Sequence, residues 1–139
     1  MNNWTLDPRL ARDSVELAMV GAIQVRAMAG APWPWLLLIP QHPDAVELFD
    51  FPSALQLQLG QLTVDLAERM KAEFAADKIN IGALGNVVPQ LHVHVIARRH
   101  GDPGWPGPVW GRIEADLAGE QAETRLRRLQ ALVNQPRSV

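Results

Sequence analysis

The stretch that decides the fold runs from residue 89 to residue 96 and reads Pro89-Gln90-Leu91-His92-Val93-His94-Val95-Ile96. Polar and aliphatic side chains alternate along it, and this alternation predicts a β-strand. Residues two apart on a strand point the same way, so Gln90, His92 and His94 are expected to project together at intervals of roughly 6.7 Å. The opposite side of the strand is aliphatic and must pack on the core. We therefore expect a rigid strand that presents two imidazoles and an amide side by side.

Three kinds of role fit two histidines with this spacing. The first is structural, with each imidazole simply satisfied by its neighbours. The second is a metal site, because histidine is a common zinc ligand, and His42, His100 or a carboxylate would then have to supply the third ligand. The third is phosphate chemistry, in which a neutral imidazole attacks phosphorus while other donors hold the phosphate oxygens. The pattern by itself leaves these three roles open.

The rest of the chain predicts strands before the motif and a long helix between them. Alternation on both sides of Gly21, over 15–20 and 23–28, predicts a hairpin. The apolar run 35–40 ends at a proline and predicts a strand buried on both faces, and 79–84 alternates as a further strand. The clearest helix spans 53–76, where Ser53 and Gln56 have the spacing of a capping box. Its apolar stripe consists of Leu55, Leu59, Leu62, Leu66, Met70 and Phe74.

Two further helices are predicted at the ends of the chain. A short one at 7–12 would take Asp7 as its N-cap and Pro8 at its first position. The other spans 112–134, with a broken apolar stripe of Ile113, Leu117, Leu126, Leu129 and Val133. Between them, the segment 100–111 is too rich in Gly and Pro for a helix or a central strand. The whole is an α+β domain with no repeat and no linker.

Composition excludes several classes of protein. The 139 residues, of 15.4 kDa, fit one domain. Cysteine is absent, which excludes a disulfide scaffold, a cysteine zinc site and thiol catalysis. The net charge of −2 argues against a nucleic-acid binder, which usually carries a basic excess. No signal peptide and no apolar run of ~20 residues is evident, so we expect a cytoplasmic protein without a membrane partner.

The stretch from Val88 to Arg98 resembles the histidine triad (HIT) signature, in which three histidines alternate with apolar residues. Gln90 stands in the first position, as in a small bacterial subgroup of the family. The resemblance extends to the strand ending at Pro40, the Gly85-Asn86 turn and Trp105-Pro106-Gly107, and covers about 14–110. It implies a single domain with an antiparallel sheet of about five strands and one long helix, paired as a homodimer. The helix 112–134 would be an added C-terminal extension.

The resemblance also implies a chemistry. HIT proteins hydrolyse or transfer nucleotidyl groups, so we expect attack on the α-phosphate of a dinucleoside polyphosphate or a nucleoside phosphoramidate, with a covalent nucleotidyl-His92 intermediate. His94 would be the acid or electrostatic partner, and Gln90 the orienting or phosphate-binding residue. No metal is required, although Mg²⁺ could accompany a polyphosphate. Because Gln90→His restores the triad, it is expected to raise the rate.

Three departures from the family pattern favour an alternative, a nucleotide-binding or regulatory module with weakened catalysis. Trp35 stands where the family often has a histidine. The segment 28–31, which includes Ala29, lacks the asparagine that contacts ribose, and Val87 replaces a serine found in some members.

Several other residues have two interpretations. Asn86 fits either a turn or a contact to phosphate or ribose. Trp105 and Trp110 fit either packing or stacking on a nucleotide base. Arg98 and Arg99 are expected to be solvated charges at a strand end.

The predicted elements also bear on assembly. One long helix leaves a face of the sheet uncovered, and the family resemblance implies that a second copy covers it through helix 53–76 and the adjacent strand. We also expect the segment after Trp105 to pack at that interface, near the site.

Overall fold

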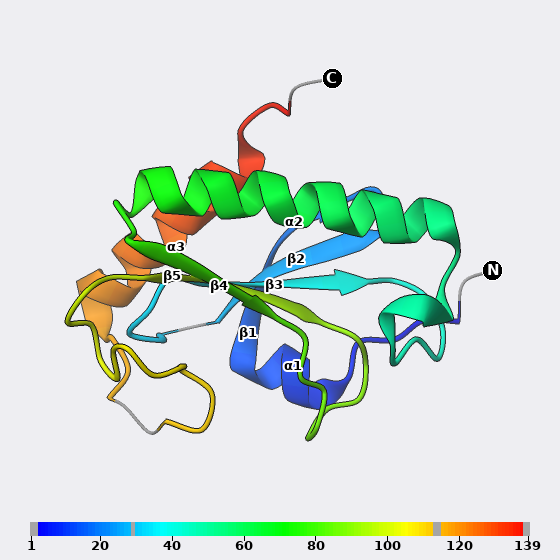
Figure 1. Cartoon of the computed structure of the whole chain (residues 1–139), viewed down its shortest axis with the longest axis horizontal. Helices are drawn as coiled ribbons and strands as arrows, with labels where there is room; N and C mark the ends of the chain where they lie inside the picture. Colours follow the sequence, from blue (N-terminus) through cyan, green and yellow to red (C-terminus); the bar gives the residue numbers. More distant parts are fainter. Residues whose placement is uncertain (1–2, 29, 113–114, 138–139) are drawn as a thin grey trace.

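The computed structural model describes residues 3–28, 30–112 and 115–137, and it forms an α+β fold as the sequence predicts (Figure 1). A five-stranded antiparallel sheet has the order β1-β2-β3-β5-β4. The elements follow along the chain as α1 (Pro8–Asp13), β1 (Ser14–Val20), β2 (Ile23–Met28), β3 (Trp35–Pro40), the 3-10 turn η1 (Leu48–Asp50), α2 (Ser53–Glu73), β4 (Lys78–Gly82), β5 (Val93–Arg98) and α3 (Gly119–Asn134).

One face of the sheet is covered by the helices α2 and α3 (Figure 1). The predicted stripe of α2 is the part that is buried there, and Leu66 and Met70 have no exposed surface. Alternate residues of β2, β3 and β5 meet it, which joins the helix and the strands in one aliphatic cluster. The two periodicities, 3.6 on the helix and 2 on the strands, therefore account for this half of the core.

The start of α2 differs from the prediction. Pro52 occupies the N-cap position, so Ser53 is already the first helical residue and its side chain makes no capping bond. The Gln56 side chain instead donates to the carbonyl of Phe51 at 2.8 Å. The predicted capping box is therefore wrong, because a proline at the N-cap shifts Ser53 out of the capping position.

The opposite face is covered by irregular chain. The segment before α1, α1 itself and the loop 99–112 that follows β5 all pack on it. Indoles pack among aliphatic side chains there, and the ring centroids of Trp33 and Trp35 lie 6.3 Å apart, edge to face. The Trp33 indole donates to the Pro103 carbonyl at 3.0 Å and so ties the loop down. The premise that one sheet face is left bare for a partner is therefore wrong, since the chain covers both faces itself.

Arg98 anchors the same loop, which corrects the expectation of a solvated charge. Its side chain is 1% exposed and forms two bonds of 2.7 Å to the carboxylate of Asp102. A third bond, of 2.8 Å, goes to the carbonyl of Gly107. The loop returns over the sheet after β5 and closes over the arginine, which a reading of the strand alone does not anticipate.

Helix α3 packs within its own chain. The predicted helix 112–134 begins only at Gly119, so Leu117 of the predicted stripe lies before it, and Ile113 lies outside the described residues. Leu129, Leu132 and Val133 are buried against α2 and the sheet. Arg69 of α2 donates to the Leu132 carbonyl at 2.9 Å and holds the end of α3. In the part of the chain that is described, no helix is long and apolar enough to cross a membrane.

Candidate active site around two histidines

His92 lies one residue before β5, and its ring is oriented by the backbone. Its Nδ1 is 2.7 Å from the carbonyl oxygen of Gln90. A carbonyl can only accept a hydrogen bond, so Nδ1 carries the proton. The neutral ring therefore has its lone pair on Nε2, which is the form that a nucleophilic imidazole requires.

His94 has the opposite arrangement. Its Nδ1 is 2.9 Å from the indole Nε1 of Trp35. An indole can only donate, so Nδ1 of His94 must be the acceptor, and the neutral ring carries its proton on Nε2. Burial, and after it the charge of His92, lowers the pKa of His94 to about 3. His94 is therefore a neutral hydrogen-bond donor at neutral pH, with its ring 4.8 Å from that of His92.

The sheet register explains how Trp35 reaches His94. Trp35 of β3 is paired with Ile96 of β5, and Leu37 is paired with His94. Trp35 is thus diagonal to His94 on the same face, at a separation that an aromatic side chain can bridge. The residue that replaces a histidine in the family pattern therefore fixes the tautomer of a triad histidine.

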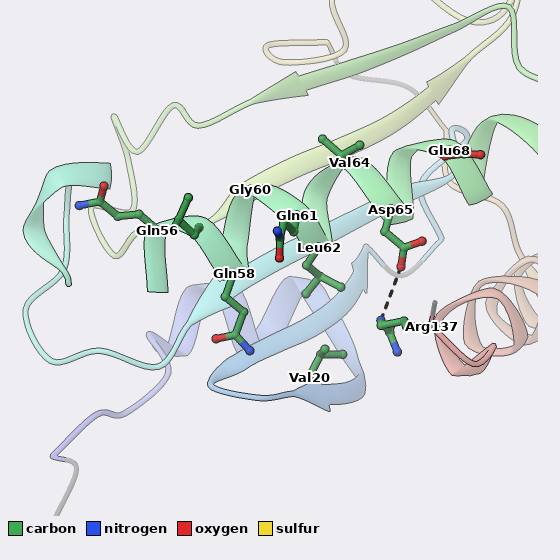
Figure 2. A pocket seen from close by; sticks show the side chains of 11 residues that line it. Val20, Gln56, Gln58, Gly60, Gln61, Leu62, Val64, Asp65, Glu68 and Arg137 are labelled. Atoms are coloured by element: carbon green, nitrogen blue, oxygen red, sulfur yellow. Dashed lines mark ion pairs between the residues drawn. The ribbon is translucent and has the colours of Figure 1, made fainter. Parts of the chain in front are cut away.

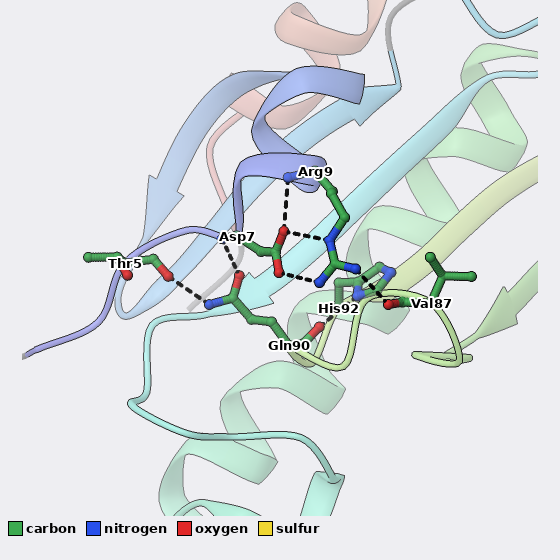
Figure 3. Close-up of polar contacts among 6 residues, drawn as sticks. All are labelled: Thr5, Asp7, Arg9, Val87, Gln90 and His92. Atoms are coloured by element: carbon green, nitrogen blue, oxygen red, sulfur yellow. Dashed lines mark hydrogen bonds and ion pairs between the residues drawn. The ribbon is translucent and has the colours of Figure 1, made fainter.

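The Gln90 side chain does not join the two imidazoles. Its amide nitrogen donates to the Thr5 carbonyl at 2.8 Å, and its amide oxygen accepts from the Asp7 N–H at 2.9 Å (Figure 3). Both bonds go to backbone more than eighty residues away along the chain. Gln90 thus orients His92 with its main-chain carbonyl and holds the N-terminal segment with its side chain.

The N-terminal segment that Gln90 holds brings the Asp7–Arg9 ion pair to the loop before His92, and the sequence alone did not indicate it. Asp7 does cap α1, as predicted, by accepting from the Arg9 N–H at 2.8 Å. Its carboxylate also accepts from the Arg9 guanidinium at 3.1 and 2.9 Å, and these bonds lower the pKa of Asp7 to about 2, with a smaller contribution from His92. Arg9 in turn donates to the carbonyl of Val87 at 3.0 Å, in the loop that leads to His92 (Figure 3). The motif Asp7-Pro8-Arg9 signals only a helix start, so no local pattern reveals this contact.

The two loop tryptophans lie at different places. The Trp110 ring is 5.4 Å from the His94 ring, edge to face, and packs over Gly82, where an added Cβ would be 3.1 Å from the indole. Its Nε1 is buried and has no acceptor among the described residues. Trp105 packs instead on His100 and on the guanidinium of Arg98, at the far end of β5. The structure thus brings Trp110 to the histidines and leaves Trp105 apart from them.

Comparison with known proteins identifies the family. A family model, the HIT domain, matches residues 23–101, more than half of the chain. The chain belongs to the HIT family. The family consists in general of nucleotide hydrolases and nucleotidyl transferases, as the motif resemblance implies.

Solved histidine triad proteins from three bacteria resemble this HIT chain over nearly its whole length. The Sinorhizobium meliloti protein is 47% identical, with a TM-score of 0.86 and 96% of each chain covered. The Bradyrhizobium japonicum protein is 39% identical, with a TM-score of 0.86 and coverage of 94% and 95%. The Marinobacter aquaeolei protein is 38% identical, with a TM-score of 0.87 and coverage of 94% and 96%. No curated protein matches the chain.

A cavity of about 270 Å³ adjoins His92 in this HIT chain. Apolar side chains form most of its wall, including Phe49, which is 78% exposed, and Leu84 from the loop after β4. Asn86 lies exposed on the same loop. Among the described residues, no three histidine or acidic side chains gather as a metal site would require. Of the family departures, Val87 is exposed beside Arg9, whereas Ala29 lies outside the described residues.

Proposed function

We propose that this HIT protein is a nucleotide hydrolase or nucleotidyl transferase that acts at the α-phosphate of a dinucleoside polyphosphate or a nucleoside phosphoramidate. One observation carries the proposal, the opposite tautomers of His92 and His94. The first leaves an unprotonated Nε2 to attack, and the second offers an N–H to an oxygen. Two structural histidines would have no need of this complementarity.

The reaction would proceed in two displacements. Nε2 of His92 forms a bond to the α-phosphorus, and the bond from phosphorus to the leaving oxygen or nitrogen breaks. The electron pair stays on the leaving atom, which takes up a proton from solvent where it is an amine nitrogen. The imidazole becomes positive as it is nucleotidylated, and the Gln90 carbonyl on Nδ1–H stabilises that charge. The His94 N–H donates to a phosphate oxygen as charge develops. Water or another acceptor then attacks phosphorus, the bond from phosphorus to Nε2 of His92 breaks, and the acceptor loses its proton to solvent.

The test is to trap the nucleotidyl-enzyme. Brief incubation with a dinucleoside polyphosphate or a nucleoside phosphoramidate, followed by quenching and mass spectrometry, should place one nucleotidyl group on the peptide that contains His92. His92→Ala should abolish both adduct and turnover, and His94→Ala should slow the reaction without abolishing it. His100→Ala, at an exposed histidine, is the matched control and should behave as wild type. Wild-type turnover in His92→Ala would contradict the proposal.

A specific observation favours the alternative, a nucleotide-binding module with weakened catalysis. A neutral His94 is a poorer proton donor to a leaving group than an imidazolium would be. This alternative predicts that nucleotides bind while no adduct accumulates and no product forms. Direct binding measured beside turnover separates the two functions.

Metal enters the proposal only with the substrate. No described cluster of ligands calls for a resident ion, so Mg²⁺ would arrive on a polyphosphate and neutralise part of its charge. Chelation by EDTA should slow turnover of a dinucleoside polyphosphate and leave turnover of a phosphoramidate unchanged.

We also propose that two copies of the chain pair through α2 and the edge strand β4. The outer side of α2 carries exposed Leu57 and Val64, at 68% and 66% exposure, along a groove drawn in Figure 2. Between them lies Gly60, where an added Cβ would meet nothing within 4 Å. A glycine inside a helix costs roughly 0.5–1 kcal/mol relative to alanine, so an exposed one is best explained by close approach of a second backbone.

The dimer has a direct test in Gly60→Lys. The site is open within the chain, so the variant should fold at least as well as wild type. The long charged side chain would block a close helix crossing and should give a monomer in light scattering. A monomeric wild-type chain, or a dimeric Gly60→Lys, would contradict pairing through this face.

A further inference from the structure

We propose that Arg9 binds the phosphate group of the ligand at His92, and that Gln90 positions it there by clamping the N-terminal segment. The inference rests on the proposed function and adds to it a residue outside the triad. Four features of the site carry it: the lack of another permanent cation, the unused donors of Arg9, the N–H groups of the neighbouring loop, and the bonds of Gln90.

Among the described residues, the motif strand and the loop before it place no permanent cation beside the two histidines. His94 is neutral because its pKa is lowered, and Gln90 replaces an imidazole that could have been protonated. The loop and strand start from residue 83 to residue 92 contain no lysine or arginine. A substrate phosphate is anionic, so the guanidinium that reaches this loop from α1 is the cation placed to meet it.

Arg9 has donors to spare. A guanidinium has five N–H groups in a fixed plane. Asp7 and Val87 take three of them, and the side chain is 45% exposed. The two that remain are one on each terminal nitrogen, the arrangement that binds a phosphate in bidentate fashion. Asp7 holds the plane in place, and the bond to Val87 keeps it at the loop before His92 (Figure 3).

The same loop offers further donors. Gly85 has a φ of +71°, and the N–H groups of residues 86–88 donate to no carbonyl among the described residues. Successive unpaired N–H groups in a turn favour an anion, as arginine does. The guanidinium and this turn are joined through the Val87 carbonyl, so one phosphate can contact both.

Gln90 is the positioning residue. α1 has only six residues, too few to hold its place without anchors. The Gln90 amide supplies two bonds, one donated and one accepted, to backbone two residues apart. A histidine does not reproduce both bonds, because its Nδ1 lies closer to the backbone than either polar atom of glutamine and its two ring nitrogens point apart. The expectation that Gln90→His raises the rate is therefore replaced by the opposite one: the exchange should loosen the segment and weaken phosphate binding.

Calorimetric titration with AMP, adenosine and inorganic pyrophosphate tests the inference. Arg9→Gln should weaken binding of AMP and pyrophosphate by about tenfold or more, because a charge-assisted bond is lost, and leave adenosine binding unchanged. Arg12→Gln is the matched control, since Arg12 lies in the same helix and pairs with the adjacent Asp13. It should bind all three probes as wild type. Gln90→Leu should reproduce the loss for AMP, and Arg9→Lys should restore part of it.

Three other outcomes would each overturn the inference. Wild-type affinity for AMP and pyrophosphate in Arg9→Gln would remove Arg9 from the phosphate site. Equal losses for AMP and adenosine would show that Arg9 only supports the fold. A wild-type chain that binds neither AMP nor pyrophosphate would exclude the phosphate site altogether. Failure of the proposed function alone would look different. The variants would still rank as expected in their affinity for AMP, but no nucleotidyl-His92 would form.

Discussion

The two faces of the sheet are built by different means. The face under α2 and α3 is aliphatic and regular, and its residues recur with the helix and strand periods. The other face is closed by loops, and its contacts include indoles, a buried arginine and two imidazoles. The aliphatic face stabilises the fold through the apolar side chains that are packed in it, so its contribution depends on their volume. The other face depends on particular hydrogen bonds, and it is the face that carries the candidate chemistry.

The largest effect on stability is expected on the aliphatic face. Leu66→Ala removes a side chain with no exposed surface and should lower the free energy of unfolding by about 2–5 kcal/mol. The kcat of the folded protein should not change, since Leu66 faces away from the histidines. Urea denaturation measures the loss, with Glu68→Ala on the exposed side of α2 as the control. A large fall in kcat would show that the two faces are coupled.

The buried ion pair makes the next test. Asp102→Asn leaves the Arg98 guanidinium buried without a counter-charge and should cost about 3 kcal/mol of unfolding free energy. Asp13→Asn breaks the exposed pair with Arg12 by the same exchange and should leave the free energy of unfolding nearly unchanged, because solvent screens that pair. Similar losses in the two variants would mean that the loop 99–112 does not need the Arg98 anchor.

Acid should weaken the loop-covered face through His94. Its pKa is about 3 in the folded chain and near 6.5 when unfolded, so below pH 6.5 only the unfolded state takes up the proton. The stabilisation is complete above pH 6.5 and is lost as the pH falls toward 3, by at most about 1.4 kcal/mol per pH unit. Denaturation between pH 7 and 4.5 should give a shallower slope for His94→Gln than for wild type. His100→Gln, at an exposed ring, should keep the wild-type slope, and a slope unaffected by His94→Gln would contradict the burial argument.

The smallest expected loss of stability comes from replacing either of two indoles, and the two replacements should differ in their effect on kcat. Trp35→Phe and Trp33→Phe each remove one buried N–H donor and should each cost about 1 kcal/mol. Only Trp35→Phe should reduce kcat, because it frees Nδ1 of His94 and no longer fixes its tautomer. Turnover assays on both variants decide this, and equal kcat values would leave Trp35 with a packing role alone.

The sequence predicted the aliphatic face far better than the other. The stripe of α2 and the alternation of β5 are local patterns, so the sheet, the long helix and the shared side of His92 and His94 could all be inferred. Even there, element ends were less accurate. α2 stops at Glu73 rather than residue 76, and β5 begins only at Val93, after His92.

The contacts that define the site could not be inferred because they join distant parts of the chain. Trp35 and His94 are 59 residues apart, and Gln90 and Thr5 are 85 apart. No periodicity links such pairs, since their meeting depends on sheet register and on how irregular segments fold back. The prediction that Arg98 is a solvated charge was wrong for the same reason. Its partners Asp102 and Gly107 belong to the loop that returns over the sheet.

The division of roles between His92 and His94 depends most directly on which ring nitrogen of each imidazole carries the proton. Nitrogen-15 NMR of protein labelled in the histidine rings reports these protons, with the signals assigned through His92→Gln and His94→Gln. The neutral ring of His92 should carry its proton at Nδ1 and that of His94 at Nε2, and His94 should stay neutral down to pH 5. The same tautomer in both rings, or a His94 that becomes charged between pH 7 and 6, would contradict the division of nucleophile and donor.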